Sequence, residues 1–190
     1  MSLPVESRAR VLRAASQSFL HQGYRTSVDA IARRAGVAKQ TVYHHFPSKD
    51  RLFTEVAREL AKGVLVELEG GDLRTALTRF ALAYRARALG AQGIAAFRTL
   101  VPEVPRFRRL ARTMYAESAG RLTEHLAAYL RAAMARGELR PDDAEVAAEM
   151  FLGMLVGVDR VKRLFGMAPR GAEAERAARI VDCFLRAYSP

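Results

Sequence analysis

The sequence predicts an all-α protein of about nine helices. Along most of the 190 residues, apolar side chains recur every three to four positions, as they do on one face of a helix. No stretch alternates apolar and polar residues as a half-buried strand does, and no repeat of fixed period occurs. Half of the residues are hydrophobic, so a packed core can form without disulfide or metal staples.

The first helix is predicted over Glu6–Gln22. Val11, Ala15 and Phe19 lie on one stripe at helical spacing. Gly23 ends the helix, and we expect the tyrosine after it to pack back on Phe19.

Two short helices around a tight turn are predicted next, within residues 26–49. Thr26 or Ser27 can cap the first helix, because a hydroxyl can accept a hydrogen bond from an amide of the opening turn. Gly36 follows that helix, where a chain leaving a helix often has positive φ. The second helix runs from Ala38 to His45, and a proline shortly after stops it. This is the helix-turn-helix pattern, whose second helix enters the major groove of DNA.

The second of these helices is rich in hydrogen-bonding groups and contains no acid, which suits an anionic partner. An ordinary solvated helix of a bundle is the alternative interpretation. By chemistry, lysine suits guanine, glutamine suits adenine, and a threonine methyl suits the thymine methyl. The candidate base-reading residues at the start and outward side of the helix are Lys39, Gln40, Thr41 and His44.

The run from Gly23 to Phe53 carries a distinctive order of residues: Gly23-Tyr24, Thr26-Ser27-Val28, Ile31-Ala32, Ala35-Gly36-Val37, Thr41-Val42-Tyr43, His45-Phe46 and Ser48-Lys49-Asp50-Arg51-Leu52. Over this run the chain resembles the DNA-binding domain of TetR/AcrR family transcriptional regulators. The resemblance implies that Tyr43 and Lys49 hold the DNA backbone, with Ser27 and His45 as helpers. Two positions depart from the family pattern: Ala38 replaces a frequent serine cap, and Gln40 replaces a frequent glycine.

Charge is distributed unevenly along the chain. The net charge is +11, and residues 1–53 hold nine Lys and Arg against three Asp and Glu, a net of +6. A basic bias concentrated on the helix-turn-helix is typical of a nucleic-acid binder. An arginine-rich composition throughout is the alternative explanation of the total net charge. Only the uneven distribution of charge is therefore used as an indication of nucleic-acid binding.

A connecting helix is predicted from Lys49 to about Glu69, with Ser48 as its N-cap. We expect Leu52, Phe53 and Val56 on its apolar stripe to hold the preceding motif. No flexible linker separates the two parts. The predicted organisation is a DNA-binding domain over residues 1–50 and an effector-binding and dimerisation domain over residues 51–190.

The remaining helices follow from caps, glycines and prolines. Gly90 and Gly93 are expected to bracket a break between two helices, and the segment from Pro102 to Val158 weakly resembles the AefR-like branch of TetR C-terminal domains. The predicted ranges are Asp72–Leu89, Ile94–Leu100, a long helix Phe107–Ala135, Ala144–Phe165 and Gly171–Tyr188.

The stretch from Met150 to Val158 is apolar all round, so it must be covered on more than one side. The resemblance implies a homodimer through the last two helices. A deeply buried helix of a monomer is the alternative. The candidate dimer residues are Met150, Gly153, Met154, Gly157, Ile180, Cys183 and Phe184.

Aromatic and methionine residues of the second half suit a small apolar or aromatic effector, because ligand sites in bundles form between helices. Ordinary core packing is the alternative. Arg85, Arg98 or Arg121 could meet an anionic ligand, although surface salt bridges explain them equally well. The candidate pocket residues are Phe80, Tyr84, Phe97, Phe107, Met114, Tyr115, Phe151 and Met154.

Three classes of function compete. A ligand-responsive repressor binding a near-palindromic DNA operator as a homodimer is favoured, and a constitutive DNA-binding protein without an effector is the alternative. An enzyme is disfavoured, because the four histidines lack metal-ligand spacing and no nucleophile elbow or phosphate loop is present. We expect no cofactor. The longest uncharged apolar run, Met150 to Val158, is too short for a membrane span. The single cysteine, Cys183, excludes an internal disulfide, so we expect a cytoplasmic location.

Overall fold

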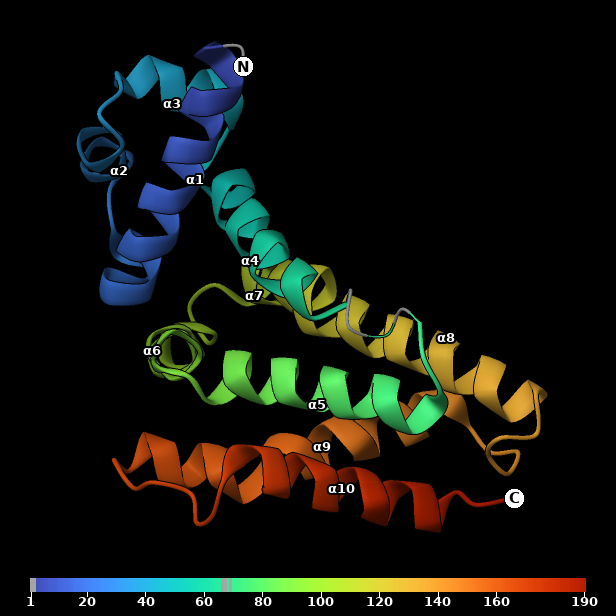
Figure 1. The fold of residues 1–190 in the computed structure, drawn as a ribbon. Helices are drawn as coiled ribbons and strands as arrows, with labels where there is room; N and C mark the ends of the chain where they lie inside the picture. Colours follow the sequence, from blue (N-terminus) through green and yellow to red (C-terminus); the bar gives the residue numbers. More distant parts are fainter. Residues whose placement is uncertain (1–2, 66–67, 69) are drawn as a thin grey trace. The chain divides into compact units, whose positions relative to one another are not determined.

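The computed structural model describes residues 3–65, 68 and 70–190, and over them the chain is all-α as predicted (Figure 1). A π turn joins two of the ten α-helices into one continuous run, which gives nine helical segments. Among the described residues, no helix has both the length and the apolar character needed to cross a membrane. The helices are α1 (Leu3–Gln22), α2 (Val28–Ala35), α3 (Lys39–His45), α4 (Lys49–Leu65), α5 (Leu73–Leu89), α6 (Ala91–Leu100), α7 (Arg108–Tyr115), α8 (Arg121–Ala135), α9 (Ala144–Leu164) and α10 (Glu173–Ala187).

The chain forms two compact units, which we call unit 1 and unit 2. Unit 1 comprises residues 1–60 and 95–118, and unit 2 comprises residues 61–94 and 119–190. These units divide the chain differently from the domains expected at residues 1–50 and 51–190. Segment 95–118 returns to the helix-turn-helix, and with it unit 1 holds 15 Lys and Arg against seven Asp and Glu.

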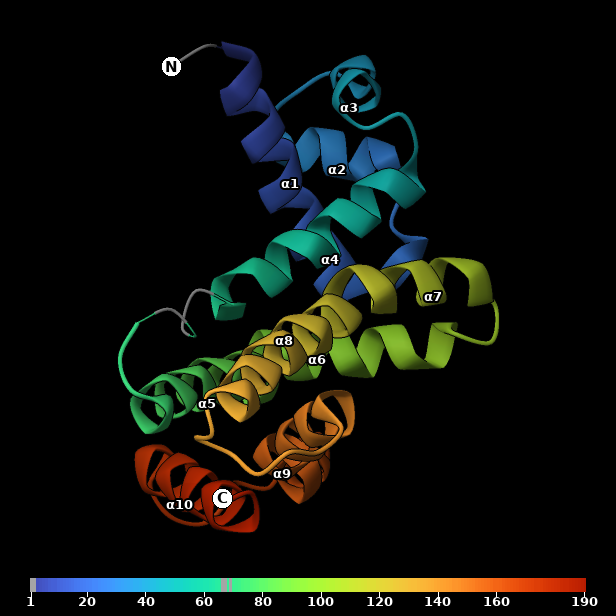
Figure 2. The same cartoon turned by 90° about the vertical axis from the view of Figure 1, so that its right-hand side faces the viewer.

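In unit 1, α1 packs against α2 and α3 around an apolar core (Figure 2). The stripe of α1 supplies Val11 and Phe19, and α4 supplies Leu52, Phe53 and Val56, all buried as expected. Each helix buries only one face, because each is amphipathic at helical spacing. The start of α4 is therefore part of the same core as the helix-turn-helix.

Within unit 1, polar and apolar contacts attach segment 95–118 to residues 1–60. The Thr99 hydroxyl donates to the Leu20 carbonyl at 3.2 Å, and Arg25 lies 3.3 Å from Glu103. Gly23 has a φ of 65°, and a Cβ there would meet the Thr99 methyl at 2.9 Å, so this close approach requires glycine. The segment also packs partly buried side chains on the unit 1 core: Leu100, Leu110 and Met114.

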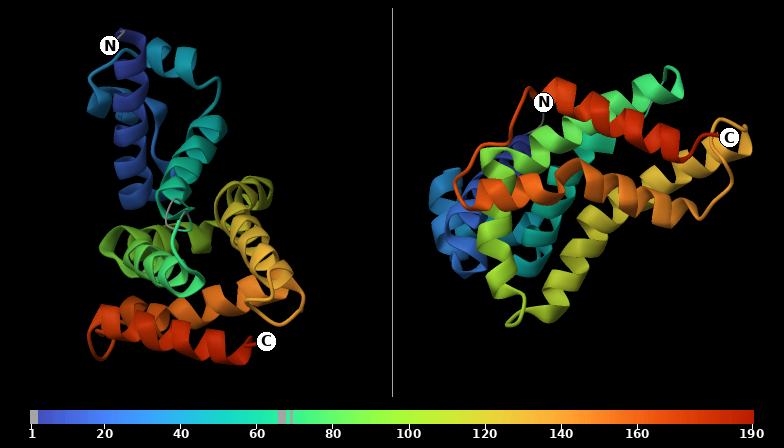
Figure 3. Two further views of the ribbon diagram at one scale, coloured as in Figure 1. Left: turned by 45° about the vertical axis from the view of Figure 1, so that its right-hand side comes forward. Right: turned by 90° about the horizontal axis from the view of Figure 1, so that it is seen from below.

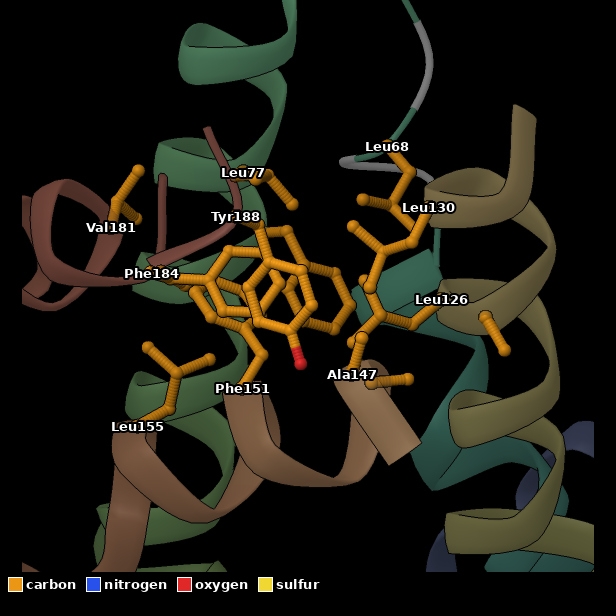
Figure 4. Close-up of a cluster of buried hydrophobic side chains, with 14 of the residues drawn as sticks. Leu68, Leu77, Leu126, Leu130, Ala147, Phe151, Leu155, Val181, Phe184 and Tyr188 are labelled. Atoms are coloured by element: carbon orange, nitrogen blue, oxygen red, sulfur yellow. The ribbon is translucent and has the colours of Figure 1, made fainter. Parts of the chain in front are cut away.

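In unit 2, α5, α8, α9 and α10 surround a second apolar core, and α9 and α10 lie side by side along it (Figure 3). A row of aromatic rings forms its centre (Figure 4). The ring of Phe151 lies 6.3 Å from Phe80 and 4.7 Å from Phe184, which in turn lies 4.6 Å from Tyr188. Contacts of this kind stabilise a core beyond simple area burial.

A buried ion network joins three helices of unit 2. Arg85 of α5 is only 2% exposed and donates to Asp159 of α9 at 3.0 Å and to Glu173 of α10 at 2.8 Å. Arg85 also donates to the Leu155 carbonyl, next to a kink in α9 at Gly157. The guanidinium thus binds a backbone carbonyl on one side of the kink and a side-chain carboxylate on the other.

Two of the predicted helix features differ from the structure. α6 begins at Ala91, so Gly93 does not bracket a break but lies inside the helix, where a Cβ would meet the Arg87 carbonyl oxygen at 2.2 Å. The predicted long helix over residues 107–135 is one continuous helical run over residues 108–135, but it contains the π turn Ala116–Gly120. The predicted end of the connecting helix near residue 69 lies outside the described residues.

Candidate nucleic-acid interface

The α2–turn–α3 motif is set by local contacts. The Ser27 hydroxyl accepts from the Ala30 amide at 3.1 Å and caps α2, as predicted. Gly36 ends α2 in the left-handed region, with φ 64°. Ala38, the residue before α3, provides no side-chain cap, so opening amides of α3 lack a side-chain partner.

α3 buries one apolar residue and directs its polar side chains outward. Val42 is the buried anchor in the unit 1 core. The other side chains of the helix are turned partly or wholly toward solvent. Lys39, Gln40, Tyr43 and His44 are exposed, and Thr41 and His45 are half-buried.

Lys39 is paired with an acid of α2. Its Nζ donates to Asp29 at 3.0 Å, and both side chains are about half exposed. The hydrogen bond and charge of Asp29 raise the pKa of Lys39. In this structure the Lys39 ammonium is therefore engaged by a neighbouring carboxylate.

His45 contacts the first helix. Its Nε2 lies 2.7 Å from the Ser7 hydroxyl, and Arg8 beside it stacks on the Phe46 ring at 5.1 Å. Burial lowers the pKa of His45 below that of a free histidine, and the charges of His44 and Arg8 lower it further. The DNA-free protein therefore favours neutral His45.

Lys49 is held over an aromatic ring. Its Nζ lies 4.2 Å from the centre of the Tyr24 ring, and the Tyr24 hydroxyl donates to Asp50. Partial burial lowers the pKa of Lys49, and Asp50 opposes that effect. Burial first, then the hydrogen bond and charge of Asp50, raise the pKa of Tyr24. The hydroxyl thus keeps its proton and remains a donor to Asp50.

Sequence reasoning missed part of this arrangement. It expected Tyr24 to pack on Phe19, and the two rings do stack at 6.4 Å. It gave no role to Asp50 or Ser7, although Asp50 adjoins Lys49 in the chain and could have drawn attention. No sequence signal could place Phe107 at 4.8 Å from Tyr24.

The predicted dimer residues lie on α9 and α10. Met150, Gly153, Met154, Gly157 and Cys183 are exposed, and Ile180 is half-buried. Phe184 corrects the expectation, since it is 1% exposed and packs between Phe151 and Tyr188 in its own core. Its face of α10 is therefore inward.

The predicted pocket residues are divided between the two units. In unit 2, Phe80 and Phe151 are fully buried in the core, Tyr84 is half-buried against it and Met154 is exposed. Phe97, Phe107, Met114 and Tyr115 belong to unit 1. Among the arginines offered for an anionic ligand, Arg85 is already bonded to two acids and a carbonyl.

Comparison with known families covers nearly the whole chain. Residues 11–56 match the family described as bacterial regulatory proteins, tetR family. Residues 75–190 match the family described as AefR-like transcriptional repressor, C-terminal domain. The chain belongs to the TetR family. This TetR-family protein is thus a DNA-binding transcriptional regulator and not an enzyme.

Relatives of known sequence agree with this family. An uncharacterized HTH-type transcriptional regulator of Mycobacterium bovis is 33% identical over 153 residues, 77% of each chain. The HTH-type transcriptional activator FasR of Mycolicibacterium smegmatis is 46% identical over 52 residues, 27% of this chain and 24% of that protein. The HTH-type transcriptional repressor AcnR of Corynebacterium efficiens is 35% identical over 57 residues, 30% of each chain. The short matches include both an activator and a repressor.

Solved structures agree over the full length. A protein from Mesorhizobium loti assigned to the TetR family superposes with a TM-score of 0.81 at 26% identity and covers 100% of both chains. The flavonoid-responsive regulator FrrA superposes with a TM-score of 0.76 at 33% identity and covers 97% of each chain. The TetR-family protein therefore shares the fold of complete regulators, in addition to their DNA-binding motif.

Proposed function

We propose that this TetR-family regulator is a ligand-responsive repressor that binds a near-palindromic operator as a homodimer. The observation that carries the proposal is the outer face of α9, where apolar side chains stay exposed at helical spacing. The exposed fractions of these side chains lie between 40% and 66% for Val146, Met150, Met154, Val158 and Val161. A contiguous apolar stripe of this kind marks an interaction surface.

In the proposed dimer, this stripe of α9 meets its own copy. A Cβ added at Gly153 or Gly157 would meet nothing within 4 Å, so both positions leave room for a close helix. Ile180 and Cys183 of α10 extend the surface. Two-fold pairing presents the same patch twice, as symmetric dimers do.

On DNA, each protomer would place α3 in the major groove. Lys39, Gln40, Thr41 and His44 would read bases, while Ser27, Tyr43, His45 and Lys49 would contact the backbone. A short helix offers only three or four base-reading groups, so a second copy at a symmetric half-site supplies the rest. The half-sites are expected roughly 34 Å apart, or a multiple of that distance.

Two observations support a ligand-responsive repressor. The match of residues 75–190 is to the C-terminal domain of AefR-like repressors. FrrA, at 33% identity, is described as flavonoid-responsive, and this agrees with the apolar or aromatic effector expected from the sequence. In unit 2, Tyr84 stacks at 6.0 Å on Phe80 while remaining half-buried, so this pair is the proposed aromatic contact for such a ligand.

A second candidate function is constitutive DNA binding without an effector. It is favoured by the rings of Phe80, Phe151 and Phe184, which contact each other in a row and are at most 1% exposed. A core filled by its own side chains has no need of a ligand to complete it. The two candidates differ in whether any ligand changes operator affinity.

Selection of bound DNA from a random pool tests the first half of the proposal. We expect an enriched near-palindrome, because two symmetric readers contact it. Enrichment of a single half-site or of no sequence would contradict the homodimeric reader. A reporter promoter carrying the selected site should be less active when the protein is present, and a more active promoter would make it an activator.

Ligand response is tested with the selected operator. Flavonoids and simple aromatic compounds are titrated by calorimetry, and operator affinity is measured with and without each bound compound. We expect coupling of about 1–3 kcal/mol for an effector. If no bound compound changes operator affinity, the ligand response is excluded and constitutive DNA binding without an effector is favoured.

Transmission of the signal is proposed to pass through α4, whose Phe53 is buried in the unit 1 core. Phe53→Ala, or Phe53→Leu if alanine unfolds unit 1, should weaken the effector-driven release of DNA more than it weakens effector binding. Equal losses in both titrations would mean that Phe53 only supports the fold.

A further inference from the structure

Tyr24 is held from two sides by neighbouring residues of α4. The Lys49 ammonium lies 4.2 Å above its ring, and Asp50 accepts the hydrogen bond of its hydroxyl. A ring attracts a cation through its negative face without neutralising it. Lys49 therefore keeps its charge and its N–H donors while its long side chain is held in one place.

The hydroxyl contact has its own consequence for Lys49. Asp50 is the nearest acid in sequence and would be a natural ion-pair partner for the ammonium. Because Tyr24 donates to a carboxylate oxygen of Asp50, part of that carboxylate is already occupied. Lys39 shows the contrast, since it donates directly to Asp29.

Tyr24 is itself positioned by a ring from a distant part of the chain. Phe107 contacts it edge-on at 4.8 Å, and Phe53 contacts it at 5.0 Å. Phe107 precedes α7 in segment 95–118. The far end of that segment is fixed by Arg58, which donates to Glu117 at 2.9 Å. The position of the Tyr24 ring thus depends on a segment that the family comparison assigns to the C-terminal domain.

We propose that Tyr24 is a positioning residue for the phosphate contact of Lys49, and that Phe107 fixes the Tyr24 ring for this purpose. This inference rests on the proposed function, in which Lys49 contacts the DNA backbone. A lysine loses rotamer freedom when it binds a phosphate, and a lysine already held by a ring loses less. Segment 95–118 thereby contributes to DNA affinity without touching DNA.

A double-mutant cycle distinguishes positioning from simple packing. The four proteins are the wild type, Lys49→Ala, Tyr24→Leu and the double variant. The probe is a random-sequence duplex of about 30 base pairs, roughly three helical turns, because phosphate contacts carry no sequence information. Fluorescence anisotropy gives the dissociation constant at several salt concentrations.

We expect Lys49→Ala to weaken binding and to reduce the log–log salt slope by about one per contact. Tyr24→Leu should raise the dissociation constant about two- to fivefold per protomer, the size of an exposed cation–π contact. The double variant should bind no more weakly than Lys49→Ala alone. Losses that add in the double variant would overturn the proposal, because Tyr24 would then act independently of Lys49.

Tyr24→Phe guards against a folding defect, since it keeps the half-buried ring and removes only the hydroxyl. It should bind between the wild type and Tyr24→Leu, with an unchanged thermal midpoint. Wild-type affinity in both Tyr24 variants would overturn the positioning role while leaving the Lys49 contact intact. Wild-type affinity and slope in Lys49→Ala would instead remove the contact on which the inference rests.

Phe107→Leu tests the distant part of the proposal. It should weaken duplex binding in the wild type and have no effect in the Lys49→Ala background. The matched control is Val101→Ala in the same segment, where the side chain is 47% exposed, and this variant should bind as the wild type does. Equal effects of the two substitutions, or an effect of Phe107→Leu that persists without Lys49, would overturn the role of Phe107.

Discussion

Helix α3 of unit 1 and helix α9 of unit 2 each bury one face in their own unit, and the faces left uncovered differ in chemistry. α3 buries Val42 and exposes lysine, glutamine, tyrosine and histidine. α9 buries Phe151 and Leu155 and exposes methionine and valine. A polar face with donors suits a wet, anionic partner, whereas an apolar stripe suits another apolar helix. The exposed face of each helix therefore indicates the kind of partner that the helix binds.

The two helices also differ in how they are held. α3 is anchored by one buried valine and has no side-chain cap, so it depends on α1 and α2 for support. α9 is anchored by a row of buried side chains and by Arg85, which bridges it to α5 and α10.

Arg85→Met removes the anchor of α9 and leaves Asp159, which is 2% exposed, with Arg176 as its remaining ion partner. Loss of one partner of a buried pair typically costs about 3–5 kcal/mol of unfolding free energy. Urea denaturation followed by circular dichroism measures it. The control is Arg74→Met, whose pair with Asp182 is about half exposed, and its cost should stay within about 1 kcal/mol. Equal losses of unfolding free energy in the two variants would show that the buried network stabilises the fold no more than an exposed ion pair does.

Val158→Glu places a charge in the middle of the exposed stripe of α9. Its side chain is 66% exposed in the single chain, so the fold should tolerate the change. In a symmetric dimer two like charges would meet, and the dissociation constant of the dimer should rise about a hundredfold or more. Sedimentation equilibrium measures it. Ala128→Glu adds the same charge at an exposed position of α8 and should leave the dimer intact. A wild-type monomer, or a dimer indifferent to Val158→Glu, would contradict the proposed interface.

Gln40→Ala tests whether the polar face of α3 reads sequence. Glutamine suits adenine in the major groove, so its loss should relax preference at one base pair per half-site, at about 1–3 kcal/mol. The measurement is a repeat of the selection from a random pool with the variant. A selected motif identical to that of the wild type at every position would make Gln40 a helix-forming residue only.

His45 gives α3 a pH dependence of defined sign. Its pKa is lowered in the DNA-free fold, mainly by burial, so acidification below about pH 6.5 costs the free protein stability. A phosphate beside His45 would favour the charged form, so the complex takes up a proton that the free protein lacks. Duplex affinity should therefore rise as pH falls from 7.5 to 5.5, by at most about tenfold per pH unit per protomer.

The matched variants for this prediction are His45→Gln and His21→Gln. The first should flatten the pH dependence of duplex affinity, and the second should not, because His21 lies exposed in the last turn of α1. A pH profile that is the same in all three proteins would exclude His45 from the phosphate contacts.

The sequence by itself determined the helices and most of their ends. Ser27, Gly36 and Ser48 were expected at helix ends, and each is found there with the expected hydrogen bond or positive φ. Asp72 likewise accepts from the Thr75 amide at 3.0 Å. These contacts join residues at most four apart, so nearest neighbours in the chain are sufficient to decide them. The order of residues around α3 was equally local, and the family followed from it.

Only the tertiary structure decided which face of each helix points inward and which distant residues meet. Phe184 and Ile180 lie four residues apart on α10, yet Phe184 packs in the core while Ile180 remains half-buried. Nothing in the sequence distinguishes Arg85 from the other arginines. Only in the folded chain do Asp159 and Glu173 lie beside it. Phe107 reaches Tyr24 because segment 95–118 returns to unit 1. Such contacts depend on how whole helices pack, a sum of many weak interactions that no short stretch of sequence contains.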